Sequence, residues 1–383
     1  ANSVHDDDIE LYTDESRSEV ALTCHGLRQQ DEKPQIATRI VPARKEVPST
    51  ACLMISKRLT CVSLMASAML TVMPSVAQAQ APLQEVTYLL PAPGTLPAFG
   101  PWMLAQAKGY YKAEGLDVKF VAARGGVDVA KQVGAGNAVI GGAIGDTPII
   151  ARAQGIPVKA VAVLGAGSLT QLVSHKDERI ESPRELKGKT VTVISYTDTT
   201  YYALLGMLSK VGLTKNDVNI QAAGPAGVWQ HFAAKKAAAM AAVPDWTATA
   251  MEAGAQVDIL PADVYFKSMA QAILASDETI AKNPQLIQKL VRATLKGMKD
   301  IMADPKAATA VYVNHVPVHK GKEASIQKAF ELFNKYVYAA QKVPGLMDEA
   351  RLGELQKFYV TNGVVPKETP LNELYTNQFV MAK

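Results

Sequence analysis

The chain has 383 residues with 48% hydrophobic and 20% charged side chains, and its formal net charge is +4. This length is sufficient for two lobes and a large buried core. The Lys and Arg residues form no basic block, which excludes nucleic acid as an expected partner.

The first 79 residues predict two segments that precede the folded part. Residues 1–53 open with an acidic run and have few periodic apolar positions, which predicts a disordered extension. An acidic interaction tail is the alternative. Residues 54–79 have a basic start, an apolar run and Ala-Gln-Ala at the end, the pattern of a secretory signal peptide. Cleavage after Ala79 would leave Gln80 first and direct the protein to the periplasm.

Removal of residues 1–79 would change the composition of the chain. It would leave 32 of the 40 Lys and Arg and 26 of the 36 Asp and Glu, a formal charge of about +6. Cys24, Cys52 and Cys61 would also be removed, and they are the three cysteines of the sequence. Disulfides, thiolate catalysis and cysteine zinc sites are therefore excluded for the processed chain.

The first half of the remaining chain alternates strand and helix patterns. Short apolar runs predict strands at 86–90, 116–121, 138–144 and 158–164, and helical periodicity predicts helices at 99–111, 128–133 and 147–154. Strands separated by helices of this length predict a mainly parallel sheet.

The same order returns about a hundred residues later with little identity. Strands are predicted at 190–194, 218–222, 238–243 and 257–260, and helices at 199–211, 227–236 and 246–253. We therefore predict an α/β protein with two similar lobes.

Two apolar segments, 170–175 and 269–276, stand where the chain would cross between the lobes. The first lobe is expected to comprise residues 80–171 and 275–383, and the second residues 172–274. Helices predicted at 285–302, 305–314, 324–337 and 349–362 form a tail that we expect to pack on the first lobe.

Sequence motifs that resemble cofactor or metal sites lie in structural contexts that do not allow those functions. Gly134-Ala135-Gly136 precedes a predicted strand and lacks the third glycine of a dinucleotide fingerprint. His315 and His319 have helical metal spacing, but Pro317 interrupts the helix that would align them. We therefore predict no catalytic residue, no metal and no cofactor.

Polar and aromatic residues gather where the predicted parallel strands end, which is where open α/β sheets bind ligands. The candidate ligand-binding residues are Phe99, Trp102, Gly145, Asp146, Thr147, Ser168, Tyr196, Thr197, Asp198, Thr199, Thr200, Trp229, Asp245 and Trp246. Each aspartate of this set stands at a helix start, so helix capping is the alternative for all three. Trp102 and Trp229 could equally be core residues.

Three sequence runs carry a resemblance to a known family: PAFGPWMLAQAKGYYKAEGLDVKF, GNAVIGGAIGDTPIIARAQGIPVKAVAVL and SPRELKGKTVTV. They resemble the nitrate, sulfonate and taurine-type substrate-binding proteins of bacterial ABC importers, a group that includes binders of thiamine-pyrimidine precursors. The resemblance covers residues 84–380. It implies the fold of a type II periplasmic binding protein, in which two hinge strands join the two α/β lobes. It also implies ligand contacts in the loop after the first strand, at 145–147 and near 196–200.

The predicted function is therefore that of a monomeric, non-enzymatic periplasmic protein. It would capture a small organic ligand between two lobes and deliver it to an ABC permease in the inner membrane. The aspartates favour a ligand that donates hydrogen bonds and the basic balance favours an anion, so sulfonates, carboxylates and flat heteroaromatics all remain open. The alternatives are an enzyme of the same fold acting on a small heterocycle, and a protein that presents its ligand to a sensor receptor.

Overall fold

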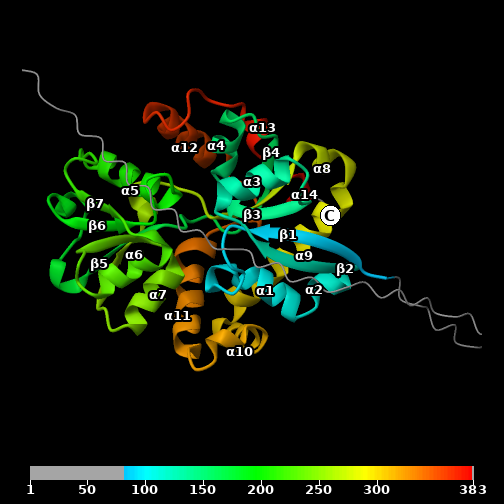
Figure 1. Cartoon of the computed structure of the whole chain (residues 1–383), viewed down its shortest axis with the longest axis horizontal. Helices are drawn as coiled ribbons and strands as arrows, with labels where there is room; N and C mark the ends of the chain where they lie inside the picture. Colours follow the sequence, from blue (N-terminus) through cyan, green and yellow to red (C-terminus); the bar gives the residue numbers. More distant parts are fainter. Residues whose placement is uncertain (1–81, 382–383) are drawn as a thin grey trace, which may run out of the picture. The chain divides into compact units, whose positions relative to one another are not determined.

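The computed structural model describes residues 82–381, which form two α/β lobes around two five-stranded sheets (Figure 1). The disordered extension predicted at 1–53 and the signal peptide predicted at 54–79 lie outside the described residues. We call the lobe that contains the N-terminal strand the first lobe.

The sheet of the first lobe has the strand order β2-β1-β3-β10-β4. Its strands are β1 (Gln84–Leu90), β2 (Leu116–Ala122), β3 (Ile140–Ile144), β4 (Val158–Val163) and β10 (Gln271–Ser276). β1 pairs in parallel with β2 and β3, whereas β10 is antiparallel to both of its neighbours, β3 and β4. Four strands therefore run in one direction and one runs against them.

The sheet of the second lobe repeats this arrangement with the order β7-β6-β8-β5-β9. Its strands are β5 (Gln171–His175), β6 (Thr190–Val193), β7 (Asn219–Ala222), β8 (Ala239–Ala242) and β9 (Val257–Leu260). β5 is antiparallel to β8 and β9, as β10 is in the first lobe. Each lobe thus receives its antiparallel strand directly after the chain crosses from the other lobe.

Burial explains why these short runs become strands. Every residue of β5 and of β10 is buried, and each of these strands has a neighbouring strand on both sides. Central strands that are covered on both faces by helices need continuous apolar runs and not an alternating pattern. The sequence supplies such runs at these positions.

The helices of the first half confirm the predicted alternation, with one exception. They are α1 (Gly100–Ala107), α2 (Tyr110–Ala113), α3 (Gly126–Gly134) and α4 (Thr147–Ala153). One helix was expected over 99–111, but the structure breaks it at Gly109, whose φ of 70° is left-handed. Glycine adopts this conformation at little cost, so the chain turns there.

The second lobe contains α5 (Thr199–Lys210), α6 (Gly224–Ala233) and α7 (Pro244–Glu252). The C-terminal part contains α8 (Asp277–Lys282), α9 (Pro284–Ala303), α10 (Pro305–His315), α11 (Glu323–Phe333), α12 (Glu349–Thr361), α13 (Leu371–Leu374) and α14 (Gln378–Met381). A π-helical turn, Asn334–Tyr338, follows α11.

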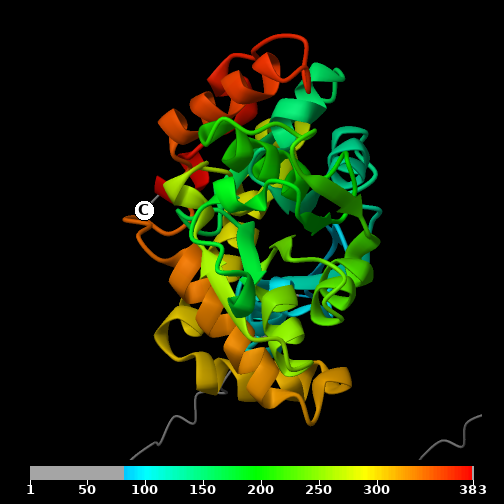
Figure 2. The ribbon, with the colours of Figure 1, turned by 90° about the vertical axis from the view of Figure 1, so that its left-hand side faces the viewer.

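The C-terminal helices pack on the first lobe, as expected, but α11 also contacts the second. α9 packs against α1, and its buried side chains join the core of the first lobe. α11 runs beside α7 (Figures 1 and 2). Ala329 and Leu332 of α11 form an apolar cluster with Ala248 of α7. The C-terminal tail therefore connects the two lobes in addition to the two crossover segments.

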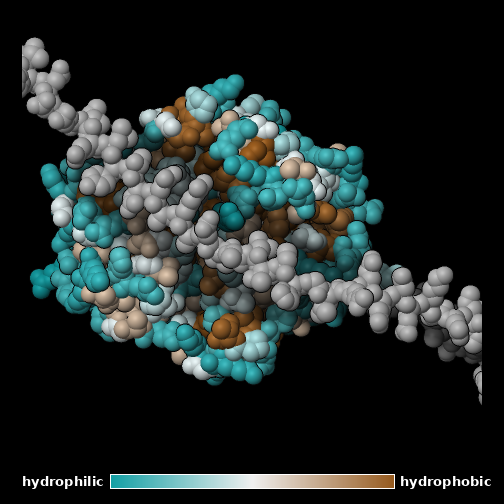
Figure 3. Space-filling view, viewed as in Figure 1, coloured by the Kyte–Doolittle hydropathy of each residue, from teal (hydrophilic) through white to brown (hydrophobic). Residues whose placement is uncertain are grey.

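Hydrophobic residues on the face shown in Figure 3 form separate groups between hydrophilic ones, as is usual for a globular protein. Between residues 82 and 381, no helix has the length and apolar character that a membrane crossing requires.

Candidate ligand-binding site

Three aspartates lie where parallel strands give way to helices. Asp146 follows β3, Asp198 precedes α5, and Asp245 is the second residue of α7. Only Asp198 caps its helix: its carboxylate accepts hydrogen bonds from the backbone N–H of Thr200 at 2.9 Å and from the Thr200 hydroxyl at 2.6 Å. Asp146, the N-cap residue of α4, makes no side-chain cap bond, and Asp245 lies inside α7, whose N-cap residue is Val243. Capping therefore accounts for one of the three aspartates.

Asp146 is a buried carboxyl group with one satisfied oxygen. The side chain is 1% exposed, and its Oδ2 accepts a hydrogen bond of 2.6 Å from the hydroxyl of Tyr359 on α12. Oδ1 is buried and has no hydrogen-bond partner in the part of the chain that the structure describes. Burial raises the pKa of Asp146 to about 6, the Tyr359 bond acts against this rise, and the charge of Asp198 adds to it. Asp198 belongs to the second lobe, so carboxyl groups from both lobes lie near one another here.

Asp245 is the corresponding buried carboxyl group of the second lobe. Its Oδ1 also lacks a partner, and burial raises its pKa to about 6. Backbone amides, including that of Ala98 in the first lobe, act against this rise. Burial raises the pKa of Tyr312 and of Tyr338, and the charge of Asp245 adds a smaller increase to both. Asp245 therefore lies among groups of the first lobe and the C-terminal tail.

A row of tyrosine rings leads from the surface to Asp146. The ring centroids of Tyr196 and Tyr201 are 5.4 Å apart, those of Tyr201 and Tyr202 are 5.7 Å apart, and those of Tyr202 and Tyr359 are 5.4 Å apart. Tyr196 is 54% exposed, whereas Tyr359 is buried. The last pair joins the second lobe to α12. Rings in this arrangement can form the wall of a site for a flat ligand.

The charges around the two buried carboxyl groups do not suit an anion. Among the described residues, no basic side chain contributes to the pKa of Asp146 or of Asp245. The N-terminus of α5 already holds the carboxylate of Asp198. No group of three or more potential metal ligands occurs in residues 82–381. The unpartnered carboxylate oxygens need hydrogen-bond donors.

The remaining predicted residues fall into two groups. Phe99 and Trp102 are buried in the core of the first lobe, with ring centroids 5.9 Å apart. Trp229 is half-buried against one core of the second lobe. Trp246 packs against the cores of both lobes, next to Asp245 in sequence. Of these aromatic residues, Trp246 is the one that joins the two lobes.

The small polar residues of the prediction also differ in position. The hydroxyl of Thr199 is buried without a partner, directly after Asp198. Thr147 is buried next to Asp146, and Thr197 is exposed. The N–H of Gly145 bonds to the carbonyl of Ala270 in front of β10 at 2.9 Å, which ties the Asp146 turn to the second crossover.

A family model described as NMT1/THI5 like matches residues 96–308, more than half of the chain. The chain belongs to the NMT1/THI5-like family. The riboflavin-binding protein RibY of Chloroflexus aurantiacus is 27% identical over 313 residues, which are 79% of this chain and 88% of that protein. The 4-amino-5-hydroxymethyl-2-methylpyrimidine phosphate synthase of Aspergillus parasiticus is 28% identical over 236 residues, 58% of this chain and 68% of that protein.

A solved structure agrees with the fold of this NMT1/THI5-like protein. The periplasmic aliphatic sulphonate binding protein SsuA from Escherichia coli has a TM-score of 0.61 at 16% identity, over 78% of this chain and 94% of that one. This similarity shows the two-lobed fold predicted from the sequence, and at this identity it concerns the fold alone.

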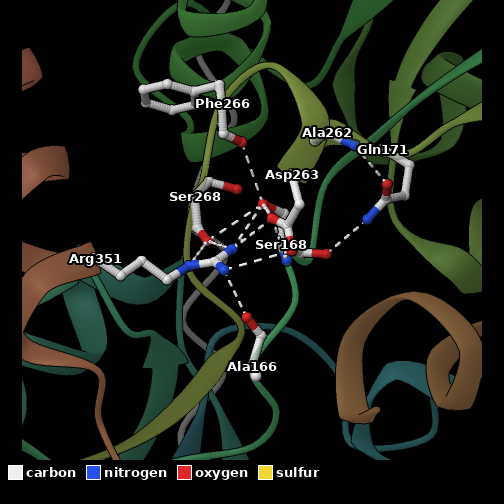
Figure 4. A network of polar contacts seen from close by, with 8 residues as sticks. All are labelled: Ala166, Ser168, Gln171, Ala262, Asp263, Phe266, Ser268 and Arg351. Atoms are coloured by element: carbon white, nitrogen blue, oxygen red, sulfur yellow. Dashed lines mark hydrogen bonds and ion pairs between the residues drawn. The ribbon is translucent and has the colours of Figure 1, made fainter. Parts of the chain in front are cut away.

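Ser168, another predicted ligand residue, lies in a polar network at the crossovers of this NMT1/THI5-like chain (Figure 4). Its hydroxyl donates to Asp263 at 2.5 Å and accepts a bond of 3.0 Å from Arg351 of α12. Arg351 also bonds to Asp263 at 2.6 Å and to the carbonyls of Ala166 and Ser268 at 2.6 and 2.7 Å. One guanidinium therefore holds both crossover segments together.

Replacement of Arg351 by Met tests this network. We expect Arg351→Met to lower the free energy of unfolding by about 3 kcal/mol, because Asp263 and two carbonyl groups lose their charged donor. Urea denaturation measures the change. Arg292→Met is the matched control: its bridge to Glu114 is surface-exposed and contributes at most about 1 kcal/mol. Equal losses in the two variants would contradict the role assigned to Arg351.

Sequence reasoning missed Tyr202, Tyr359, Asp263 and Arg351. Tyr202 lies two residues beyond the polar run 196–200, so extension of that run by two residues would have included it. Tyr359 lies 213 residues from its partner Asp146, and Arg351 lies 88 residues from Asp263. No spacing rule connects residues so far apart.

Proposed function

We propose that this protein is a solute-binding protein that holds a small, flat, N–H-donating organic ligand between its two lobes. The observation that carries the proposal is the pair of buried carboxyl groups, Asp146 and Asp245, each with one oxygen that has no hydrogen-bond partner within residues 82–381. A buried polar oxygen without a partner costs free energy. A ligand that supplies an N–H group to each carboxylate removes this cost, and the tyrosine row would pack against its ring.

The relatives support a nitrogen heterocycle over a sulfonate. One is named for riboflavin and another for a 4-aminopyrimidine phosphate, and both compounds contain ring nitrogen. SsuA is named for aliphatic sulphonates, but its similarity to this chain lies in the fold. A sulfonate next to Asp146 would bring two negative charges together without a described basic group to offset them.

The rest of the proposal concerns partners and location. The lobes close about the crossovers that lead into β5 and β10, and the ligand-bound form delivers its cargo to an ABC permease from the periplasm, as a monomer. Closure stabilised by ligand is the general behaviour of two-lobed binding proteins. The signal-like pattern of residues 54–79 supports export. Cell fractionation that finds the protein in the cytoplasm would contradict this part.

A panel of three compounds tests the ligand class. We expect isothermal titration calorimetry at pH 7 to show binding of riboflavin or of 4-amino-5-hydroxymethyl-2-methylpyrimidine, with a Kd on the order of micromolar, and no binding of ethanesulfonate. The N–H-bearing heterocycles complement the two carboxylates and the sulfonate does not. The reverse order of affinities would contradict the proposal.

Enzymatic activity is the second candidate function, because several relatives are named as synthases. Under the proposal the protein returns its ligand unchanged. Mass spectrometry of each compound after overnight incubation with the protein distinguishes the two functions. A chemically altered product would favour an enzyme, with Asp146 or Asp245 as a candidate acid or base.

A further inference from the structure

Helix α12 contacts the first lobe, the second lobe and a crossover at once. Its Tyr359 donates to Asp146 of the first lobe and packs against Tyr202 of the second. Its Phe358 packs against Phe266 of the second crossover with ring centroids 4.6 Å apart. All of α12 lies beyond the residues that match the family model. This helix therefore adds to the candidate site a residue that the matched part of the chain does not contain.

The direction of the Tyr359 hydrogen bond is determined by chemistry. Burial and the charge of Asp146 raise the pKa of Tyr359 well above its usual value, so the phenol keeps its proton and is the donor. Asp146 Oδ2 is the acceptor. This bond engages one carboxylate oxygen and leaves Oδ1, which is buried and has no partner among the described residues, to accept a hydrogen bond from a ligand.

We propose that Tyr359 is a specificity-determining residue of the ligand site, which acts by holding Asp146 so that Oδ1 accepts an N–H group of the ligand. The inference rests on the proposed function. The carboxylate bonded to Tyr359 is a pure acceptor, so it favours ligands with an N–H at this point and disfavours those with an anionic oxygen. Tyr359 is a positioning residue here, and its ring forms a wall of the site with Tyr202.

The groups that face Asp146 determine how it titrates. They are the Tyr359 hydroxyl on α12, the Asp198 carboxylate at the start of α5 and the backbone N–H of Asp146 itself. The Tyr359 bond lowers the pKa of Asp146, and the backbone N–H does so to a smaller extent. Loss of the hydroxyl should therefore raise that pKa further.

The test is a carbon-13 NMR titration of the Asp carboxyl groups in the full, ligand-free protein, with Asp146 assigned by Asp146→Asn. In Tyr359→Phe we expect the Asp146 midpoint to rise by about one pH unit, which is what the loss of one hydrogen bond to the charged form produces. The matched control is Tyr375→Phe. It removes a hydroxyl that bonds at 2.6 Å to Glu349, at the start of the same helix, so the Asp146 midpoint should not move.

A second readout separates this inference from the proposed function. Riboflavin and the aminopyrimidine serve as probes. At pH 7 we expect Tyr359→Phe to bind about tenfold more weakly the compound that the wild type binds. Tyr375→Phe should bind that compound with wild-type affinity. A folded Tyr359→Phe variant with an unchanged Asp146 midpoint overturns the inference, whichever compounds bind. An unchanged affinity together with a moved midpoint overturns it as well. Failure of every probe to bind the wild type counts against the proposed function, and the midpoint still decides whether Tyr359 holds Asp146.

Discussion

Raising the pH from 3 to 7 is expected to remove about 6 kcal/mol of stabilisation that Asp146 and Asp245 together provide to the ligand-free protein. The pKa of each carboxyl group rises from 3.8 to about 6 on folding. Each therefore contributes about 3 kcal/mol at low pH, where both the folded and the unfolded forms are protonated. Urea denaturation across this pH range measures the loss.

The sign follows from proton uptake. Between pH 4 and 6 the folded chain binds more protons at these two sites than the unfolded chain, so stability falls as the pH rises and the loss is complete above the folded pKa. The double variant Asp146→Asn/Asp245→Asn cannot titrate at these positions. Its free energy of unfolding should lack the pH dependence that Asp146 and Asp245 cause. The difference between the stability–pH curves of the wild type and the double variant therefore separates the effect of these two groups from that of the other carboxyl groups. Parallel curves would show that the two side chains are not buried as described.

Asp245→Asn is expected to weaken binding of the N–H-donating ligand by about 10- to 100-fold at pH 7. A hydrogen bond to a charged acceptor contributes roughly 1.5–3 kcal/mol, and the neutral amide also presents an NH₂ group that can oppose the ligand donor. Calorimetry with the heterocycle that binds the wild type measures the loss. Asp146→Asn should act similarly.

The control for this substitution is Asp304→Asn. Asp304 caps α10 through the N–H of Ala307 on an exposed surface, and Asn caps equally well. We expect wild-type affinity and stability in this variant. Retained affinity in both Asp245→Asn and Asp146→Asn would remove the two carboxyl groups from the ligand site, even if the protein still binds a heterocycle elsewhere.

Local patterns predicted most secondary-structure elements. The strand predicted at 190–194 is β6 (Thr190–Val193), and the helix predicted at 199–211 is α5 (Thr199–Lys210). These predictions succeed because the spacing of apolar residues and the residues at a helix start both belong to a single element. The single helix predicted over 99–111 failed because its apolar spacing continues through Gly109, and periodicity does not register a left-handed residue.

The sequence by itself determined the two-lobed α/β fold and the position of three aspartates at the ends of parallel strands, because both depend on order along the chain. It presented those aspartates as equivalent. Only the tertiary structure decided that Asp198 caps a helix, whereas Asp146 and Asp245 are buried with an unpartnered oxygen. The reason is physical: burial and hydrogen bonding depend on which distant segments meet, and Tyr359 reaches Asp146 across 213 residues through the packing of α12.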